Sequence, residues 1–240
     1  MQRTGKYRPR RTNTYVPAMG YSVDMIHEGP YEVKFGPMAV ASAANILSAQ
    51  SIATATDTVT AGITLLRDNT DPVVEAFREE FPYGPGFGRN VTVVASGAAT
   101  STVTITGRDY LGQPMVETLT LNGTTSVAGN KAFKYIDKIA WGATASTTIN
   151  VGTGTKFGLP YRMQNVLAEM SDRARVATLG TFVAGLLTDP QTATTGDPRG
   201  TYVPNTTPDG TKYLAATFLP NSFVNANGNG GLYGIAHFGG

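Results

Sequence analysis

The 240-residue sequence contains no cysteine and only two histidines, and 15% of its residues are charged. Without cysteine the chain can form neither disulfides nor thiolate metal sites. The histidines, His27 and His237, are far apart in the sequence, and neither belongs to a His-x-x-x-His pair or lies beside an acidic cluster. We therefore predict no metal site and no cofactor.

The sequence also lacks the common catalytic motifs. No Gly-x-Ser-x-Gly elbow is present, so a Ser/His/Asp hydrolase has no support. The glycine-rich run at residues 84–88 carries proline where a phosphate-binding loop needs N–H groups. Glu79 and Glu80 are expected on the exposed side of a short helix and not as a glycosidase pair. We predict that the protein is not an enzyme.

Long hydrophobic runs are absent too. No stretch approaches the ~18 apolar residues that span a bilayer. The basic residues near Met1 are not followed by the apolar segment of a signal peptide. We expect no membrane partner and no export by a signal peptide.

What the chain does have in quantity is glycine (28), proline (14) and threonine (34). Threonine favours strands, while glycine and proline favour the turns between them. In residues 102–106 Val103 and Ile105 alternate with three threonines, which is typical of a sheet with one buried face. Further strands are predicted at 91–94, 116–121, 147–151 and 212–219, so the predicted fold is all-β, an antiparallel β-sandwich or jelly roll.

The connectors between the central strands are short and rich in turn residues. Residues 95–101 and 107–114 are too short to hold a crossover helix, which argues against a parallel α/β sheet. Both connectors therefore predict antiparallel hairpins between strands that are neighbours in sequence.

One helix is predicted, from Asp71 to Phe81, with Asp71 as its N-cap and Pro72 at its first helical position. Three other segments are compatible with either helix or strand. They are the alanine-rich residues 39–44, residues 133–141, and residues 165–187.

The distribution of charge is asymmetric. The first 23 residues carry +5, which leaves −3 for the rest of a chain whose net charge is +2. A basic, proline-containing segment of this kind is expected to be extended and to gain order on a partner surface. That partner could be nucleic acid, on whose bases Tyr7 and Tyr15 would stack, or an acidic protein surface. Because the rest of the chain has no basic excess, we predict that nucleic acid is not the partner.

Within residues 90–160 four segments form a recognisable set, 104–114 (TITGRDYLGQP), 117–123 (ETLTLNG), 131–136 (KAFKYI) and 148–154 (TINVGTG). With these segments, residues 90–160 resemble a β-sandwich module of the virion proteins of tailed phages. The closing segments DPRGTY (197–202), DGTK (209–212) and LYGIA (232–236) are similar to the C-terminal portions of such proteins.

The resemblance implies a virion structural protein that supplies no catalytic residues. We expect a cement or decoration protein on the capsid surface, with the major capsid protein and copies of itself as partners. The alternatives are a tail, head-completion or adhesion protein, or a carbohydrate-binding sandwich.

The predicted organisation is an extended N-terminal arm (1–37), a sandwich body (38–220) and a C-terminal arm (221–240) with a short terminal strand. The N-terminal segment fits equally well an extension that folds back on its own domain. Arms of this type can add strands to neighbouring subunits. The residues predicted to bind the partner are Arg3, Lys6, Tyr7, Arg8, Arg10, Arg11, Tyr15, Leu232, Tyr233, Ile235 and Phe238.

Overall fold

The computed structural model describes residues 14–16, 21–23, 30–54, 56–59, 87–110, 112–192, 194 and 196–220. For 14–16, 21–23, 56–59 and Pro220 it describes the backbone only. All regular elements in this part of the chain are strands, so the predicted all-β class is confirmed. The strands are β1 (Thr14–Val16), β2 (Tyr21–Val23), β3 (Tyr31–Pro37), β4 (Ser42–Ser51), β5 (Thr56–Val59), β6 (Arg89–Ala95), β7 (Thr102–Arg108), β8 (Pro114–Thr120), β9 (Val127–Phe133), β10 (Tyr135–Trp141), β11 (Thr148–Gly158), β12 (Met163–Ser171), β13 (Ala174–Arg175), β14 (Thr181–Ala184), β15 (Gly200–Val203) and β16 (Tyr213–Pro220).

Fourteen of these strands form three antiparallel sheets, while β1 and β2 pair with each other. The first sheet has the order β5-β10-β7-β8. The second has the order β14-β15-β11-β6-β9, with β4 and β15 following each other along the edge of β11 that faces away from β6. The third has the order β13-β12-β16-β3.

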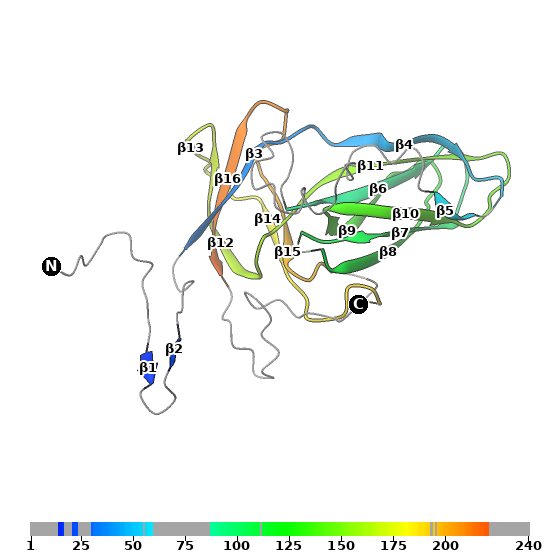
Figure 1. Ribbon diagram of the computed structural model, residues 1–240. Coiled ribbons are helices and arrows are strands. Elements are labelled where there is room, and N and C mark those ends of the chain that lie inside the picture. Colours follow the sequence, from blue (N-terminus) through cyan, green and yellow to red (C-terminus); the bar gives the residue numbers. More distant parts are fainter. Residues whose placement is uncertain are drawn as a thin grey trace, which may run out of the picture.

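The first sheet and the larger part of the second form one sandwich, which we call the larger sandwich (Figure 1). Its core contains Val103 and Ile105 from β7, Val91 and Val93 from β6, and the single tryptophan, Trp141. The burial of β7 alternates along the strand, with both apolar residues inside, as its sequence pattern predicts. β6 is buried over most of its length because it lies in the interior of the second sheet.

The third sheet packs against β14, β15 and the end of β11 to form the smaller sandwich, seen on the left of Figure 1. Its core is aromatic, and Tyr202 lies between Phe35 and Phe218 with ring centroids 6.1 Å and 5.3 Å away. β11 contributes Val151 to the larger core and Phe157 to the smaller one. A single strand therefore runs through both cores and connects them.

The structure decides the segments whose sequence fits either helix or strand. The alanine-rich run leads into β4, residues 133–141 contain β10, and residues 165–187 contain most of β12 together with β13 and β14. In each case long-range pairing outweighs local propensity. The strands predicted at 91–94, 102–106, 116–121, 147–151 and 212–219 correspond to β6, β7, β8, β11 and β16. The predicted helix at 71–81 lies outside the described residues.

One predicted hairpin is wrong. The connector at 107–114 joins the paired strands β7 and β8, as expected. The connector at 95–101 instead crosses from the second sheet to the first, because β6 pairs with β9 and β11 while β7 pairs with β8 and β10. A short connector can join two facing sheets as well as two neighbouring strands, and sequence length alone does not separate the two.

The strand β3 lies within the range predicted as the N-terminal arm. It pairs with β16 over most of its length, and Val33 and Phe35 are buried in the smaller core. Residues 31–37 are thus part of the folded body. The predicted C-terminal arm, 221–240, lies outside the described residues.

Candidate functional site

The residues predicted to bind a partner lie almost entirely outside the described residues. Tyr15 belongs to β1, of which only the backbone is described, and the other ten lie in residues 1–13 and 221–240. The structure therefore neither brings these residues together nor separates them, and their role stays a prediction.

The structure instead reveals a cluster of buried charged residues where the two sandwiches meet. We call it the polar joint, and it consists of Arg89, Asp109, Glu117, Lys131, Asp197 and Arg199, whose exposed fractions are all 3% or less. Charged side chains are rarely buried this deeply unless they are paired or hydrogen-bonded. The polar joint is the candidate site that the described part of the chain offers.

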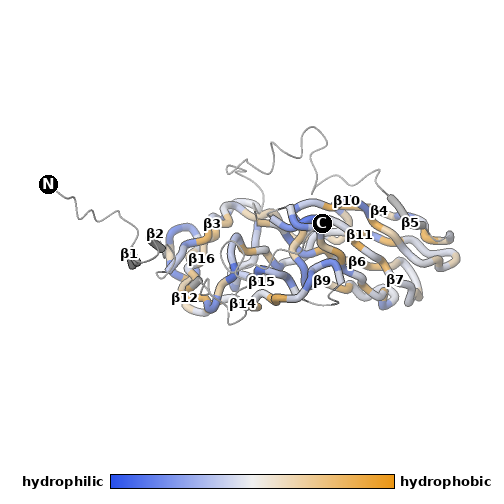
Figure 2. Tube along the Cα trace, turned by 60° about the horizontal axis from the view of Figure 1, so that its bottom comes forward, coloured by the Kyte–Doolittle hydropathy of each residue, from blue (hydrophilic) through white to orange (hydrophobic). Residues whose placement is uncertain are grey.

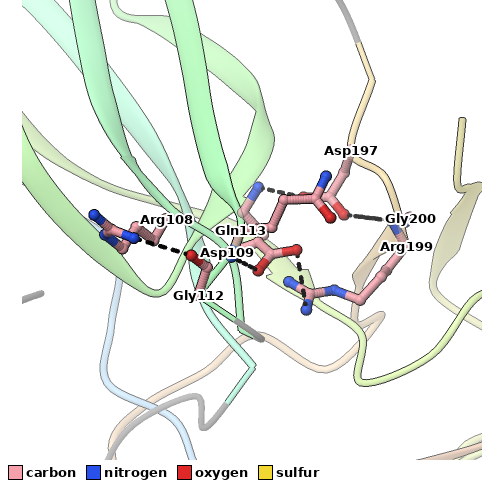
Figure 3. A network of polar contacts seen from close by, with 8 residues as sticks. Arg108, Asp109, Gly112, Gln113, Asp197, Arg199 and Gly200 are labelled. Atoms are coloured by element: carbon pink, nitrogen blue, oxygen red, sulfur yellow. Dashed lines mark hydrogen bonds and ion pairs between the residues drawn. The ribbon is translucent and has the colours of Figure 1, made fainter. Parts of the chain in front are cut away.

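Asp109 and Arg199 form the ion pair at the centre of the polar joint (Figure 3). Arg199 Nη1 lies 3.3 Å from Asp109 Oδ2, and both side chains are fully buried. Asp109 follows β7, where its Oδ1 accepts a hydrogen bond of 2.9 Å from the backbone N–H of Gln113. The guanidinium also lies 5.5 Å from the ring centroid of Tyr110. The turn between β7 and β8 is thereby tied to the segment that precedes β15.

Asp197 fixes the backbone conformation of the segment that precedes β15 and attaches this segment to β9 (Figure 3). Its Oδ1 accepts hydrogen bonds from the backbone N–H groups of Arg199 and Gly200, at 2.9 Å and 3.1 Å. Its Oδ2 accepts one of 2.8 Å from the N–H of Ala132. Burial raises the pKa of Asp197, although the positive charge of Arg199 and these N–H groups act in the opposite direction.

Glu117 and Lys131 connect β8 to β9, which border different sheets and are not paired with each other. The Glu117 carboxylate accepts hydrogen bonds from the backbone N–H groups of Asn130, at 2.6 Å, and Lys131, at 3.4 Å. Lys131 Nζ donates to the carbonyl oxygens of Val116, at 2.6 Å, and Pro190, at 2.7 Å. The Glu117 side chain therefore accepts hydrogen bonds from the edge of β9 that the backbone of a neighbouring strand would otherwise accept.

Burial opposes ionisation at both of these residues. It raises the pKa of Glu117 and lowers the pKa of Lys131, and the attraction between the two charges acts against both shifts. Ionisable groups in this environment are sensitive to the loss of either partner, because the remaining charge stays buried without compensation.

Arg89 lies at the start of β6 and contacts β11 and the segment between β3 and β4. Its Nη1 donates to the carbonyl oxygen of Ala39 at 2.9 Å and its Nε to that of Gly154 at 2.5 Å. The guanidinium lies 5.0 Å from the ring centroid of Phe157, within the range of a cation–π contact. Burial lowers the pKa of Arg89 to about 10, so the side chain stays charged at neutral pH.

A second buried carboxylate cluster lies within the smaller sandwich, around Glu169 of β12. This side chain is 1% exposed and accepts hydrogen bonds from three backbone N–H groups and one hydroxyl. The donors are Gly180 N at 3.0 Å, Asn205 N at 3.0 Å, Thr206 N at 2.9 Å and Tyr202 Oη at 2.5 Å. Glu169 thus attaches both outer ends of the β14–β15 hairpin to the third sheet.

Every charge in these clusters is directed at backbone groups or at an opposite charge, an arrangement that fixes positions. Within the described residues no group of three or more His, Asp or Glu side chains could hold a metal ion. The described residues likewise form no helix that is long and apolar enough to cross a membrane.

The sequence carries only a partial signal for the polar joint. Asp109 and Arg199 lie in two of the motifs on which the phage resemblance rests, GRDYLGQP and DPRG, but nothing in the sequence pairs them. Glu117 and Glu169 look like ordinary polar positions of half-exposed strands. Comparison of the chain with protein-family models, with curated proteins and with solved structures found no match.

Proposed function

We propose that this protein is a structural component of a tailed-phage virion, a cement or decoration protein that binds the major capsid protein on the outside of the head. The observation that carries the proposal is the resemblance of residues 90–160 to the sandwich modules of such proteins. These residues form β6 to β11, which supply most of the larger sandwich. The resemblance therefore covers most of one of the two sandwiches.

The polar joint supports a mechanical role. The Asp109–Arg199 ion pair joins the turn between β7 and β8 to the segment before β15, and Asp197 attaches that segment to β9, while Glu117 and Lys131 connect β8 to β9 within the larger sandwich. Ion pairs of this kind contribute little net stability compared with apolar packing, but their geometry allows few alternative arrangements. A body with a fixed relation between its two halves suits a protein that bridges lattice positions on a shell.

In this proposal the basic N-terminal segment provides the attachment. Its five cations and its tyrosines would contact an acidic face of the capsid protein. Each contact is weak, but repetition over many lattice sites raises the effective concentration of every further contact.

The first experiment is the copy number in purified particles, measured by quantitative mass spectrometry relative to the major capsid protein. A simple ratio, such as one to one or one to three, is expected for a cement protein. A ratio of a few per cent of the capsid protein would assign the chain to the tail or the portal region. Absence from the particle would overturn the structural role.

The second experiment tests the attachment with the full-length chain. Replacing Arg8, Arg10 and Arg11 by alanine, or deleting residues 1–20, should abolish binding to capsids that lack the protein. The matched control replaces two exposed arginines, Arg173 in the β12–β13 turn and Arg175 in β13, and should bind normally. Equal binding by both sets of variants would refute the role of the arm.

A further inference from the structure

The segments that precede and follow the described body start from neighbouring points of the third sheet. β3 begins at Tyr31 and β16 ends at Pro220, and the antiparallel register of these two strands places Tyr31 opposite Phe218. Paired residues of antiparallel strands have their Cα atoms about 4.5–5.5 Å apart. Residues 1–29 and 221–240 therefore leave the sheet side by side, although they lie at opposite ends of the sequence.

We call this place the exit end, meaning the start of β3, the end of β16 and the start of β12, which pairs with β16 there. Side-chain contacts fix it in addition to strand pairing. The rings of Tyr31 and Tyr161 lie edge to face, with their centroids 5.3 Å apart. Arg162 Nε donates a hydrogen bond of 3.2 Å to the carbonyl oxygen of Gly185, which follows β14. Both segments thus start from a well-fixed part of the body.

The exit end belongs to the smaller sandwich, which forms one end of an elongated body. Figures 1 and 2 both show β3, β12 and β16 at this end, and β5 and β7 of the first sheet at the opposite end. The hairpin of β1 and β2 precedes β3 and pairs with no other strand that the structure describes. This part of the segment before β3 therefore extends none of the three sheets.

The two segments carry different chemistry. Residues 1–29 contain five basic residues and two acidic ones. Residues 221–240 contain no Asp, Glu, Lys or Arg, and six of them are large apolar or aromatic residues. The first segment suits an acidic surface, and the second suits an apolar surface or the edge of a sheet. A partner that offers both features would be held at two points from one place on this protein.

We propose that the exit end faces the capsid, and that residues 1–29 and 221–240 bind the same surface of the capsid protein side by side. This inference rests on the proposed cement function and adds an orientation, with the smaller sandwich toward the shell and the larger sandwich outward. Eleven residues, 221–231, separate β16 from Leu232, and a chain of that length reaches at most about 40 Å. Because both segments start from one place, binding of either raises the effective concentration of the other.

The first test introduces single cysteines at exposed positions of the full-length chain, which has none of its own. The positions are Gln164 at the start of β12, Arg175 at the opposite end of the third sheet, and Thr118 on β8 of the first sheet. The alkylation rate of each thiol is measured in the free protein and on capsids that otherwise lack it. Binding should slow alkylation of Gln164→Cys by about tenfold or more, and that of the other two variants by less than about twofold, because only a covered thiol is shielded from the reagent.

The second test asks whether the two segments contact the same surface. Thr12→Cys, next to Arg11, and Ala236→Cys, next to Ile235, each carry a photoreactive group on the introduced thiol in separate full-length variants. After irradiation on the particle, mass spectrometry should locate both cross-links on one exposed face of the capsid protein. The same group on Thr118→Cys is the matched control and should give no cross-link to the capsid protein.

Each of the other outcomes overturns the inference. If the protein binds capsids but protection at Thr118 or Arg175 equals or exceeds that at Gln164, or if no position is protected, the exit end does not face the shell and the proposed function still stands. Cross-links from position 236 that reach only this chain would mean that the segment after β16 folds back on its own body. A full-length chain that does not bind capsids would overturn the proposed function together with the inference.

Discussion

At the scale of single residues, buried carboxylates fix the positions of several loops by accepting their hydrogen bonds. Glu169 and Asp197 each accept hydrogen bonds from at least three groups, most of them backbone N–H groups of loops. Loops of a sheet protein contain many N–H groups without a strand partner, and a buried group of this kind needs an acceptor. One ionised side chain can serve several at once.

Glu169→Gln is expected to destabilise the protein by about 3–5 kcal/mol, because the amide replaces an acceptor oxygen with a donor that faces N–H groups in a buried site. The free energy of unfolding in urea measures the effect. Glu32→Gln is the matched control, since Glu32 is 51% exposed and its contact with Lys34 is 3.9 Å long. The control should change stability by about 0.5 kcal/mol or less. Similar losses for both variants would contradict the role of Glu169.

A pH-dependent prediction follows from Glu117. Burial raises its pKa above the ordinary 4.5, so above that pH the unfolded chain has lost a proton that the folded chain still holds. The contribution of Glu117 to stability is therefore largest at low pH and decreases as the pH rises through the folded-state pKa. Glu117→Gln removes this dependence. The free energy of unfolding of the native protein, relative to this variant, should decrease between pH 4 and pH 7.

The control for this experiment is Asp209, whose pKa is lowered by hydrogen bonds from the backbone N–H groups of Lys212 and Thr211. Its contribution to stability has the opposite sign, being present at neutral pH and decreasing as the pH falls. A pH dependence of the same sign for Glu117→Gln and Asp209→Asn would contradict the assignment.

At the scale of strands and sheets, close approach between backbones decides which strands pair. β11 accommodates β6 on one edge and β4 followed by β15 on the other. Gly152 lies where β4 crosses, and a Cβ at this position would overlap the carbonyl oxygen of Ser42 and the backbone of Ala43. The absence of a side chain is what allows β4 to approach.

Gly152→Ala should therefore displace β4 and destabilise the protein by about 1–3 kcal/mol. Gly97→Ala is the matched control, because a Cβ there would meet only Thr147 Oγ1 at 3.8 Å, which is an ordinary contact. Thermal unfolding of both variants measures the difference. Hydrogen exchange should locate the extra opening of Gly152→Ala in β4, and equal exchange in the two variants would refute the explanation.

At the scale of the whole molecule, two hydrophobic cores share β11 and are joined by buried charges. Because β11 contributes Val151 to one core and Phe157 to the other, unfolding either sandwich would expose apolar side chains of a strand that the other sandwich needs. We therefore expect the two sandwiches to unfold together, although each has its own core.

Trp141 provides the test, because the only tryptophan lies in the larger core. Phe218→Ala, a change in the smaller core, should cost about 3–5 kcal/mol and lower the denaturation midpoint seen by Trp141 fluorescence. The fluorescence and circular dichroism transitions should coincide before and after the substitution. A Trp141 midpoint that stays unchanged in Phe218→Ala would mean that the sandwiches unfold independently.

The sequence by itself determined the all-β class and several strands, because alternation such as that of residues 102–106 is a local pattern with a period of two. It did not determine the pairing of strands across sheets, as the wrong hairpin at 95–101 demonstrates, nor the strand state of the alanine-rich run before β4.

Only the tertiary structure decided the polar joint. Asp109 and Arg199 are ninety positions apart in the sequence, and Glu117 and Lys131 look like solvated strand residues until β8 and β9 are placed together. Their burial results from how two sheets close over each other, which is a long-range property that no local pattern encodes. Patterns among neighbouring residues thus predict many of the strands. The environment of a charged side chain, in contrast, depends on residues that only the fold brings near it.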